Sequence, residues 1–432
     1  MAVYYVDPKN GNHGNDGLSS LMPVCSCDDV DFKAGDTLLY KRGSFIRGRL
    51  NNKSGTKDKP IVYGAYGEGA APTFCGSSDI GSRENWRELD RNIWVYENAA
   101  SETANLIFNN SDKCGSLKWS VDELRQQGDF YDSFFGVYSQ KKQPPEQHRL
   151  YMYSKGNPGD IYSAIECTTC GMRTLASNGE NMIFDGLRFI NNGIHAIAGE
   201  GKSRNIIIKN CVFEFIGGAV YDDVRKIRYG NAIEFWNVGE NIEVSGCYFN
   251  NIYDSAITHQ GCSKCMPADK LVIKDNVFIR CGMAAYEQRD RMPKNSVFEN
   301  NICIDAGEGF SKNGMKMPRR SEIWPQPMGH HIFLWRINNP TKDGGLEIKN
   351  NIFYNAPYGA AIYSIASENA EKQVRLEDNT YYTENRENIC RWNGKNYSDF
   401  KDYSRYDTNS RNIKLDIKAL LNQWLTVHNM CG

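Results

Sequence analysis

No window of this chain approaches the ~20 consecutive apolar residues that a membrane-spanning helix requires. Charge of neither sign is in excess, because the formal net charge is −1 over 432 residues. Such a balance provides no electrostatic attraction to nucleic acid or to an anionic membrane surface. Long helical patterns are also scarce, whereas Gly and Asn are frequent. We therefore expect a β-rich chain with no nucleic-acid partner and no membrane partner.

Cysteine is too sparse for a disulfide scaffold, since 14 Cys in 432 residues fall far below the ~8–10% of such proteins. The pairs Cys167-x-x-Cys170 and Cys262-x-x-Cys265 have spacings that suit a tetrahedral zinc site. The two pairs are far apart in the chain, however, and nothing in the sequence indicates that they meet. We expect free thiols and no bound metal.

Signals for export and for cofactors are missing as well. No signal peptide precedes the first expected strand, Tyr4-Tyr5-Val6. Together with the many thiols, this favours a cytoplasmic protein, and a secreted protein whose leader has been removed is the alternative. The chain has no Walker loop, no dinucleotide-binding glycine fingerprint and no Gly-x-Ser-x-Gly elbow. We expect no cofactor.

What the chain does contain is one phrase that restarts at intervals of roughly 24 to 30 residues, within the range of stacked repeats. Each copy has a short apolar strand, a polar pair, Asn or Cys, one further residue and an aromatic. The copies begin at Ile183, Ile207, Val244, Val272, Val297, Glu347 and Arg375. Val, Ile, Phe and Tyr with Gly and Asn at the corners favour strands over helices.

Two columns run through these copies in fixed register. The first column holds Leu187, Cys211, Cys247, Asn276, Asn301, Asn351 and Asn379. The second holds Phe189, Phe213, Phe249, Phe278, Cys303, Phe353 and Tyr381. We predict that the amides of the first column hydrogen-bond from coil to coil at a left-handed corner, and that the second column stacks as the core. Unrelated strands of a sandwich would not keep both columns, so the sequence predicts a parallel β-helix.

The β-helix is expected to span residues 1–400 as a single domain. Residues 82–170 depart from the repeat and are interpreted as an inserted β-rich excursion that forms one wall of the cleft, with a short capped helix over 120–127. Residues 311–345 form the largest interruption and are expected to be a long loop over the cleft. The helical periodicity of 413–428 predicts a helix within 401–432 that caps the last coil.

The first coils carry a family resemblance. FKAGDTLLYKRGSFIRG at 32–48 is followed by KPIVYGAYGEGAAPTFCGS at 59–77, after the turn-rich opening YYVDPKNGNHGNDGLSS. With the coils at 181–381, these phrases resemble the bacterial right-handed parallel β-helix proteins of the carbohydrate-active class. The resemblance implies a pectin-lyase-like fold. It does not fix the reaction, because the class includes glycoside hydrolases, polysaccharide lyases and C5-epimerases.

Acidic residues and an imidazole follow the core aromatics on one expected face. A second strand is expected just after each core aromatic. When these second strands are aligned on a pair of small apolar residues, Asp222, His259 and Glu287 fall at equivalent positions, with Glu234 one step away. Coils about 4.8 Å apart would separate such groups by about 5–10 Å, which covers the carboxyl pairs of retaining and inverting glycosidases. Three acids nearer the corners complete the candidate catalytic set, with turn formation as an equal alternative: Asp254, Asp305 and Glu308.

Aromatic and cationic residues near these acids are candidates for binding substrate. Flat aromatic faces suit the C–H surfaces of sugars, and cations suit carboxylate or sulfate. The candidate binding residues are Tyr221, Trp236, Tyr286, Arg289, Lys312, Trp324, His330 and Trp335. The neighbouring pair His330-His331 could also bind a metal, but no Asp or Glu stands at a matching spacing.

The leading hypothesis is a glycoside hydrolase that acts on an oligosaccharide or polysaccharide, because that chemistry needs two carboxylates and no cofactor. The alternative is a polysaccharide lyase or C5-epimerase acting on uronic acids, with a base and a cation drawn from Tyr286, Arg289, Lys312 and His259. A non-catalytic glycan-binding solenoid is the third hypothesis, which needs the aromatics but not the acids.

Overall fold

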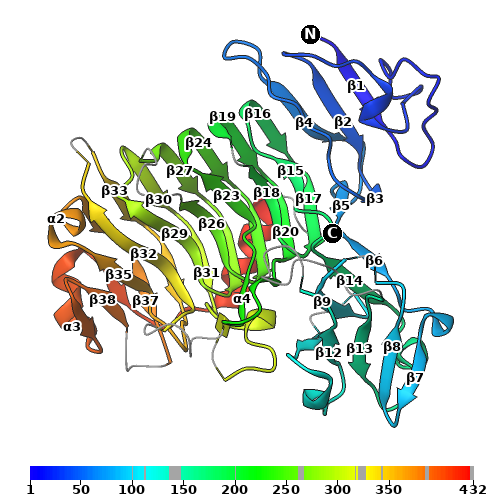
Figure 1. The fold of residues 1–432 in the computed structure, drawn as a ribbon. Helices are drawn as coiled ribbons and strands as arrows, with labels where there is room; N and C mark the ends of the chain where they lie inside the picture. The colour runs from blue at the N-terminus through cyan, green and yellow to red at the C-terminus, as the bar shows by residue number, and fades with distance from the viewer. Residues whose placement is uncertain are drawn as a thin grey trace.

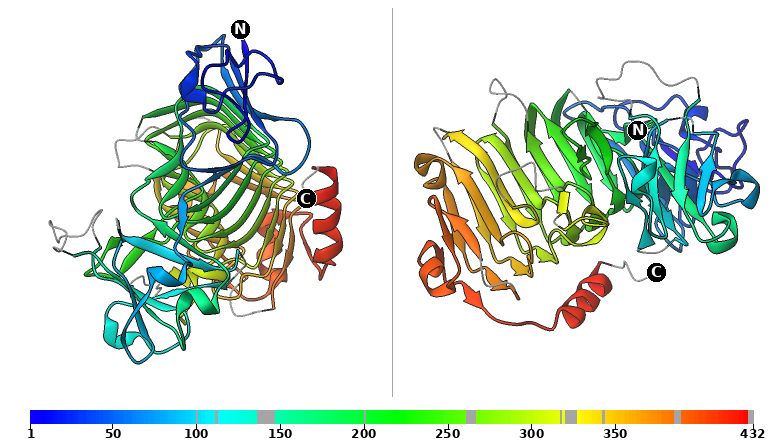
Figure 2. Two further views of the ribbon diagram at one scale, coloured as in Figure 1. Left: turned by 90° about the vertical axis from the view of Figure 1, so that its right-hand side faces the viewer. Right: turned by 60° about the horizontal axis from the view of Figure 1, so that its bottom comes forward.

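Stacked parallel strands dominate the structure (Figure 1). The computed structural model describes all residues except 100, 111–112, 136–146, 200, 261–266, 317, 320–326, 342–343, 385–388 and 429–432. Three long sheets wrap around one axis, which is seen nearly end-on in the left view of Figure 2 and from the side in the right view. The chain is a right-handed parallel β-helix of the pectin-lyase type, so the predicted fold class is confirmed.

From β16 to β38, each coil contributes one strand to each sheet. The first sheet contains β1 (Val3–Val6), β2 (Thr37–Lys41), β4 (Ile61–Tyr66), β16 (Glu180–Asp185), β19 (Lys202–Lys209), β24 (Val238–Ser245), β27 (Asp269–Lys274), β30 (Ser296–Glu299), β33 (Leu346–Lys349), β36 (Val374–Glu377) and β40 (Asp407–Thr408). The second sheet contains β3 (Phe45–Arg47), β5 (Thr73–Cys75), β17 (Arg188–Asn192), β20 (Val212–Ile216), β25 (Tyr248–Ile252), β28 (Val277–Cys281), β31 (Ile302–Ile304), β34 (Ile352–Tyr354), β37 (Thr380–Tyr382) and β41 (Arg411–Asn412).

The third sheet is the one that bears on function. It contains β15 (Thr174–Ser177), β18 (His195–Gly199), β23 (Ile233–Trp236), β26 (Ser255–Gln260), β29 (Ala284–Arg291), β32 (His330–Asn339), β35 (Ile362–Ala366), β38 (Cys390–Trp392) and β39 (Lys395–Tyr397). Strand β32 lies within 311–345, so the later part of the expected long loop is instead a regular strand that pairs with β29 and β35.

A row of aromatic rings forms the centre of the core, as predicted. Phe213 stacks on Phe249 with 4.8 Å between ring centroids and 6° between ring planes. Phe249 stacks on Phe278 at 4.8 Å and 12°, and Phe189 stacks on Phe213 at 5.5 Å. These spacings match the ~4.8 Å between parallel strands. The ring stack therefore follows from the pairing of successive coils.

The predicted amide ladder is also present. Asn276 Nδ2 donates to Asn301 Oδ1 at 3.0 Å, Asn301 Nδ2 to Asn351 Oδ1 at 3.1 Å, and Asn351 Nδ2 to Asn379 Oδ1 at 2.9 Å. The last amide donates to Asp407 Oδ2 at 2.9 Å. All four Asn side chains are buried, so the ladder satisfies polar groups that water cannot reach.

One detail of that prediction is wrong. The left-handed conformation belongs to the residue before each ladder Asn, not to the ladder Asn itself. Asp275, Asn300, Asn350 and Asp378 have φ values of 57°, 56°, 55° and 57°. Asn and Asp tolerate this region because their short polar side chains can hydrogen-bond locally. The ladder residue is then free to direct its amide inward.

The inserted excursion forms two small sheets beside the first coils. One contains β6 (Ser77–Asp79), β9 (Thr103–Phe108), β10 (Lys113–Cys114) and β14 (Ile165–Thr169), and the other β7 (Arg87–Asp90), β8 (Ile93–Tyr96), β11 (Ser116–Leu117), β12 (Asp129–Asp132) and β13 (Leu150–Tyr153). Within the expected helix over 120–127, only a 3₁₀ turn, η3 (Val121–Glu123), forms. The remaining short helices here are η2 (Arg83–Asn85) and α1 (Pro158–Ile161).

The C-terminal helix, α4 (Ile417–Val427), does not cap the last coil, and this prediction is wrong. It lies along the flank of the β-helix (Figure 2), where Trp424 packs with Val277 and Ile302 of the second sheet. Trp424 Nε1 donates to the carbonyl of Asp275 at 3.0 Å. Tyr403 of α3 (Phe400–Tyr403) instead covers the end of the core and contacts Tyr381, with ring centroids 5.7 Å apart.

The other helical segments are single turns at coil corners. They are η1 (Cys27–Asp29), η4 (Gly309–Ser311), α2 (Glu368–Glu371) and η6 (Ser404–Tyr406). Strands β40 and β41 extend the β-helix beyond residue 400, where it was expected to end. Among the residues with a described placement, no helix has the length and apolar character needed to cross a membrane.

Replacing Asn301 with Leu should lower the free energy of unfolding by roughly 1–3 kcal/mol, the cost of leaving buried partners unsatisfied. Asn301 Oδ1 accepts from both the backbone and the side chain of Asn276, and its Nδ2 also donates to the carbonyl of Ile273. Urea denaturation measures the change. The matched control is Asn422→Leu on exposed α4, which should be nearly neutral. Equal stabilities would contradict a structural role for the ladder.

Candidate active site

A cleft with a volume of about 920 Å³ lies over the third sheet. Six successive strands, β15 to β32, contribute side chains to its lining. The hairpin formed by β21 (Ala219–Asp222) and β22 (Ile227–Tyr229) adds further lining residues. Arg319 and Met328, which precede β32, also line the cleft. Residues of the interruption at 311–345 therefore contribute to the lining.

The excursion was expected to form a wall of this cleft, but no described residue of 82–170 lines it. The excursion instead supports the hairpin from behind. Glu102 accepts a hydrogen bond from the backbone of Val220 at 2.8 Å. Arg228 donates to the carbonyl of Ala104 and to Asn105 Oδ1, both at 2.7 Å. These contacts attach the hairpin to the excursion.

Glu234 of β23 lines the cleft, and its side chain is almost completely buried. Its Oε2 lies 2.8 Å from His195 Nε2, and its Oε1 accepts from Gln260 Nε2 at 2.6 Å. Burial alone would raise the pKa of Glu234, but His195, Gln260 and Asn231 outweigh burial and hold the pKa below its ordinary value. Glu234 is therefore ionised at neutral pH.

His195 of β18 holds this carboxylate in place. Its Nδ1 accepts the backbone N–H of Asn231 at 3.1 Å. An imidazole that accepts at Nδ1 carries its proton on Nε2, so Nε2–H donates to Glu234. The sequence prediction missed His195. The strand GIHAIAG at 193–199 has the same pattern as GNAIEFW at 230–236, so including it in the alignment could have found this residue.

Asp254 reaches the same cleft from the corner before β26. Its Oδ2 accepts from Arg319 Nη2 at 2.9 Å. Its Oδ1 is buried and has no hydrogen-bond partner among the described residues. Burial raises the pKa of Asp254, Arg319 and Arg289 lower it, and Glu287 raises it, with a net increase above the ordinary value. Asp254 therefore retains its proton to a higher pH than an exposed aspartate.

The cleft thus holds two carboxyl groups whose pKa values are shifted in opposite directions. Glu234 accepts hydrogen bonds that stabilise its charged form. Asp254 is desolvated and close enough to Glu287 for repulsion to favour its neutral form. A carboxyl group with a lowered pKa beside one with a raised pKa is the arrangement that general acid and base catalysis requires.

Glu287 was expected to face the cleft beside Glu234, but it is fully buried and does not line the cleft. Its Oε2 accepts from Ser255 at 3.0 Å and from Thr258 at 3.2 Å, and its Oε1 pairs with Arg289 Nε. Arg289 does line the cleft. Glu287 therefore positions Arg289 in the cleft.

The expected alignment of the acids is also wrong by one residue. Glu234 pairs with Thr258, which pairs with Glu287, so this column does not contain His259. A shift of one residue moves a side chain to the other face of a strand. His259 accordingly points away from the cleft, where burial lowers its pKa to about 4 and Gln288 Nε2 lies 3.1 Å from its Nδ1.

Asp222 is not in that column either, because it belongs to the hairpin β21–β22. Its two oxygens accept from the backbone and side chain of Arg225 at 2.8 and 2.7 Å. The hydrogen bond from the Arg225 backbone lowers the pKa of Asp222, and burial opposes this only in part. Asp222 therefore stabilises the turn and does not line the cleft.

The two remaining acids form corners. Asp305 has a φ of 51° and accepts from Asn355 Nδ2 at 2.8 Å. Burial raises the pKa of Asp305, but this residue lies outside the cleft. Glu308 precedes η4 and accepts from the Tyr358 hydroxyl at 2.9 Å. For both residues the structure supports the turn-forming alternative.

The candidate binding residues divide in a similar way. Those that line the cleft are Tyr221, Trp236, Arg289 and Trp335. Tyr286 is fully buried and donates to Gln288 at 2.6 Å, and Lys312 lies over the Tyr358 ring at 4.2 Å. His330 is buried, with its pKa lowered to about 4. These three do not line the cleft, and Trp324 lies outside the described residues.

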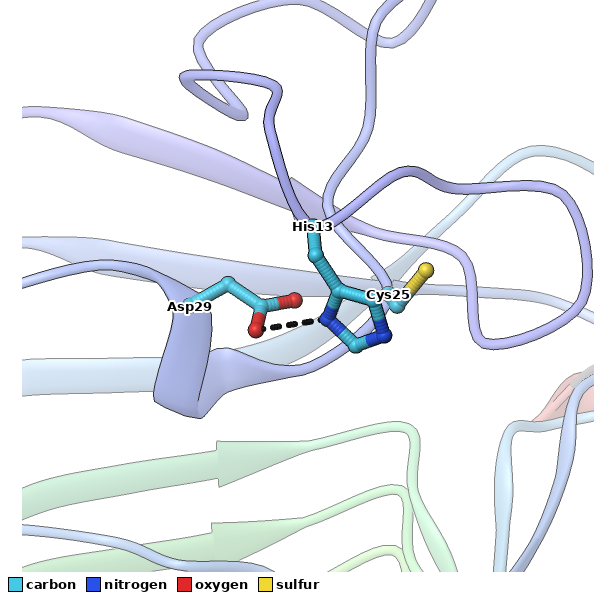
Figure 3. Close-up of side chains that lie close together, drawn as sticks. All are labelled: His13, Cys25 and Asp29. Atoms are coloured by element: carbon cyan, nitrogen blue, oxygen red, sulfur yellow. Dashed lines mark hydrogen bonds and ion pairs between the residues drawn. The ribbon is translucent and has the colours of Figure 1, made fainter.

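Metal-binding side chains come together elsewhere in the described structure. His13, Cys25 and Asp29 offer ligand atoms within 4.8 Å of one another near η1 (Figure 3). Asp29 already accepts from Ser26 as part of a capping box and pairs with His13 Nδ1 at 2.9 Å. The turn therefore explains this arrangement without a metal.

The zinc spacing noted in the sequence finds no support in its first pair. Cys167 and Cys170 are buried free thiols, and burial raises the pKa of both, that of Cys167 to about 12. A neutral thiol is a poor metal ligand. The second pair, Cys262 and Cys265, lies outside the described residues. Every cysteine that the structure describes is a free thiol.

No protein-family model matches the chain, and no curated protein matches it. Among solved structures it is similar to a protein named as a glycoside hydrolase, with a TM-score of 0.50 and 10% identity over 98% of both chains. It is also similar to a GH136 lacto-N-biosidase from Eubacterium ramulus, with a TM-score of 0.47 and 15% identity over 95% of this chain and 67% of that one.

A third similar structure is a pectate lyase, with a TM-score of 0.37 and 13% identity over 89% of this chain and 76% of that one. These similar structures are right-handed parallel β-helix carbohydrate-active enzymes. The resemblance predicted from the first coils is confirmed, and at these identities it concerns the fold.

Replacing Glu287 with Gln should lower the free energy of unfolding by about 2–4 kcal/mol, because it breaks a buried ion pair with Arg289. The control is Asp222→Asn, whose partner Arg225 is exposed, and this change should cost less than about 1 kcal/mol. Urea denaturation of both variants tests the assignment. A small effect of Glu287→Gln, equal to that of the control, would contradict the supporting role of Glu287.

Proposed function

We propose that this protein is a glycoside hydrolase in which Asp254 is the general acid and Glu234 is the ionised carboxylate. The observation that supports the assignment most strongly is the opposite shift of the two pKa values within one cleft. Glycoside hydrolysis requires one carboxyl group that donates a proton and one that activates water or attacks carbon. No cofactor or metal takes part in this chemistry.

Asp254 would protonate the leaving oxygen, and its Oδ1, which has no partner in the described structure, is the oxygen that can carry the proton. Its pKa is raised, as general acids require. Arg319 holds the other oxygen at 2.9 Å and so fixes the carboxyl plane. Once the proton has left, Arg319 and Arg289 stabilise the negative charge that forms on Asp254.

Glu234 would then activate a water molecule or attack the sugar directly. It aligns with Thr258, four residues beyond Asp254, so the two Cα atoms are about 14 Å apart at ~3.3 Å per residue and ~4.8 Å per strand. Two side chains built from bonds of about 1.5 Å together shorten this gap by roughly 6 Å at most. The remaining gap of at least roughly 8 Å exceeds the ~5 Å of retaining enzymes and therefore favours an inverting reaction.

A polysaccharide lyase or C5-epimerase is the second candidate, supported by the guanidinium groups of Arg289 and Arg319 in the cleft. An arginine could neutralise a substrate carboxylate while a base removes the neighbouring proton. Of the residues predicted to serve this chemistry, Tyr286, Lys312 and His259 lie outside the cleft and only Arg289 lines it. This pattern favours hydrolysis over elimination.

Glu234→Gln and Asp254→Asn should each reduce turnover of a hydrolysable oligosaccharide by at least about a hundredfold, the usual contribution of a proton-transfer group. New reducing ends measure hydrolysis, whereas an unsaturated product that absorbs in the ultraviolet would indicate a lyase. The control Asp305→Asn removes a carboxylate outside the cleft and should retain activity. Full activity in both cleft variants would contradict the proposal. If the wild-type protein releases no product from any glycan, a non-catalytic binding protein is favoured instead.

The pH dependence of kcat/KM should be bell-shaped. Glu234 must be ionised, so activity falls as the pH drops through its lowered pKa, and Asp254 must be protonated, so activity falls as the pH rises through its raised pKa. In Asp254→Glu, which keeps an acid of different length and environment, the alkaline limb should move and the acid limb should stay. An unmoved alkaline limb would assign the proton to another group.

A further inference from the structure

Cations outnumber carboxylates in the cleft. Six arginines line it: Arg49, Arg173, Arg225, Arg289, Arg319 and Arg336. The acids in the lining are Glu234 and Asp254. When the partners Asp222 and Glu287 behind the lining are included, six guanidinium groups face four carboxyl groups. The excess is local, because the whole chain has a net charge of −1.

The arginines are spread along the axis of the β-helix and do not form a single cluster. Arg49 Nη2 donates to Ser177 Oγ at 2.9 Å, which places it at β15, the first strand of the third sheet. Arg336 belongs to β32, five strands further along. Five strand spacings of ~4.8 Å separate the two ends by about 24 Å. Glu234 of β23 lies between them.

The two end arginines are also exposed to incoming ligand. Arg49 has a hydroxyl partner, and Arg336 lies over the Trp335 ring at 4.8 Å. Neither forms an ion pair with any residue whose placement is described. By contrast, Arg225 and Arg319 pair with the acidic side chains of Asp222 and Asp254 at 2.7 and 2.9 Å. The ends of the cleft therefore keep guanidinium donors available for an anion from outside.

We propose that the cleft binds a polyanionic glycan whose carboxylate or sulfate groups recur along its chain. A single anion could neutralise one end of a cleft about 24 Å long, but not both ends. The planar fork of Arg matches the paired oxygens of carboxylate and sulfate. Trp236 and Tyr221, both partly exposed in the lining, offer flat faces to the sugar rings between the charges.

This inference rests on the proposed function for the position of the cleaved bond, but binding does not depend on catalysis. Isothermal titration of the wild-type chain should use three probes of matched length: an oligogalacturonate, a sulfated dextran and an uncharged dextran. At least one anionic probe should bind about tenfold or more tightly than the uncharged probe, and its affinity should fall as salt is added. The preferred anionic probe identifies carboxylate or sulfate as the recognised group.

The two ends are tested by Arg49→Gln and Arg336→Gln. Each should weaken binding of the preferred anionic probe about three- to tenfold, and the double variant should weaken it by the product, because distant sites contribute independently. Arg91→Gln, an exposed arginine of the excursion, is the matched control and should leave binding unchanged.

Several outcomes would overturn the inference. Equal or tighter binding of the uncharged dextran would remove the anionic specificity. Loss of affinity in only one of the two arginine variants would indicate a single anion at one end and not a repeating one. If both variants weaken binding while Glu234→Gln retains full turnover, the polyanionic ligand stands and the proposed catalytic assignment fails.

Discussion

Parallel backbone pairing between successive coils sets nearly every distance in this protein. Each coil lies one strand spacing, about 4.8 Å, above the last, and the Phe213–Phe249 and Phe249–Phe278 stacks at 4.8 Å reproduce that spacing in the core. The Asn276–Asn301–Asn351–Asn379 ladder adds buried hydrogen bonds along the same direction. The same spacing on the third sheet places side chains from six coils along one cleft.

Within that cleft, burial acts on both carboxyl groups, and their partners decide the outcome. Glu234 receives donors from His195 and Gln260, which stabilise its negative charge. Asp254 has an ion pair at one oxygen only, and the negative charge of Glu287 opposes its ionisation. A low effective dielectric strengthens both effects. The β-helix thus shifts the pKa values of two similar side chains in opposite directions.

The core could be predicted from the sequence because its columns repeat at a nearly constant interval, so Phe213 and Asn301 fall into register without knowledge of the structure. The register of the third sheet could not be predicted, because its strands differ in length and its small residues align equally well when one strand is shifted by one position. That ambiguity placed His259 in the column of Glu287, where Thr258 actually lies. The hairpin that carries Asp222 and Arg225 was missed because it lies in an insertion between regular strands. Arg289 was predicted, whereas Arg336 was missed because its strand β32 lies within residues expected to form a loop.

The most direct test of this account is a pH titration of the two carboxyl groups themselves. Difference infrared spectra of the wild-type chain against Asp254→Asn and Glu234→Gln isolate each carboxyl band. The account predicts that the protonated band of Asp254 persists to a higher pH than that of an ordinary aspartate, whereas Glu234 stays ionised below the pKa of an ordinary glutamate. Coincident titration of the two groups, or the reverse order, would contradict it.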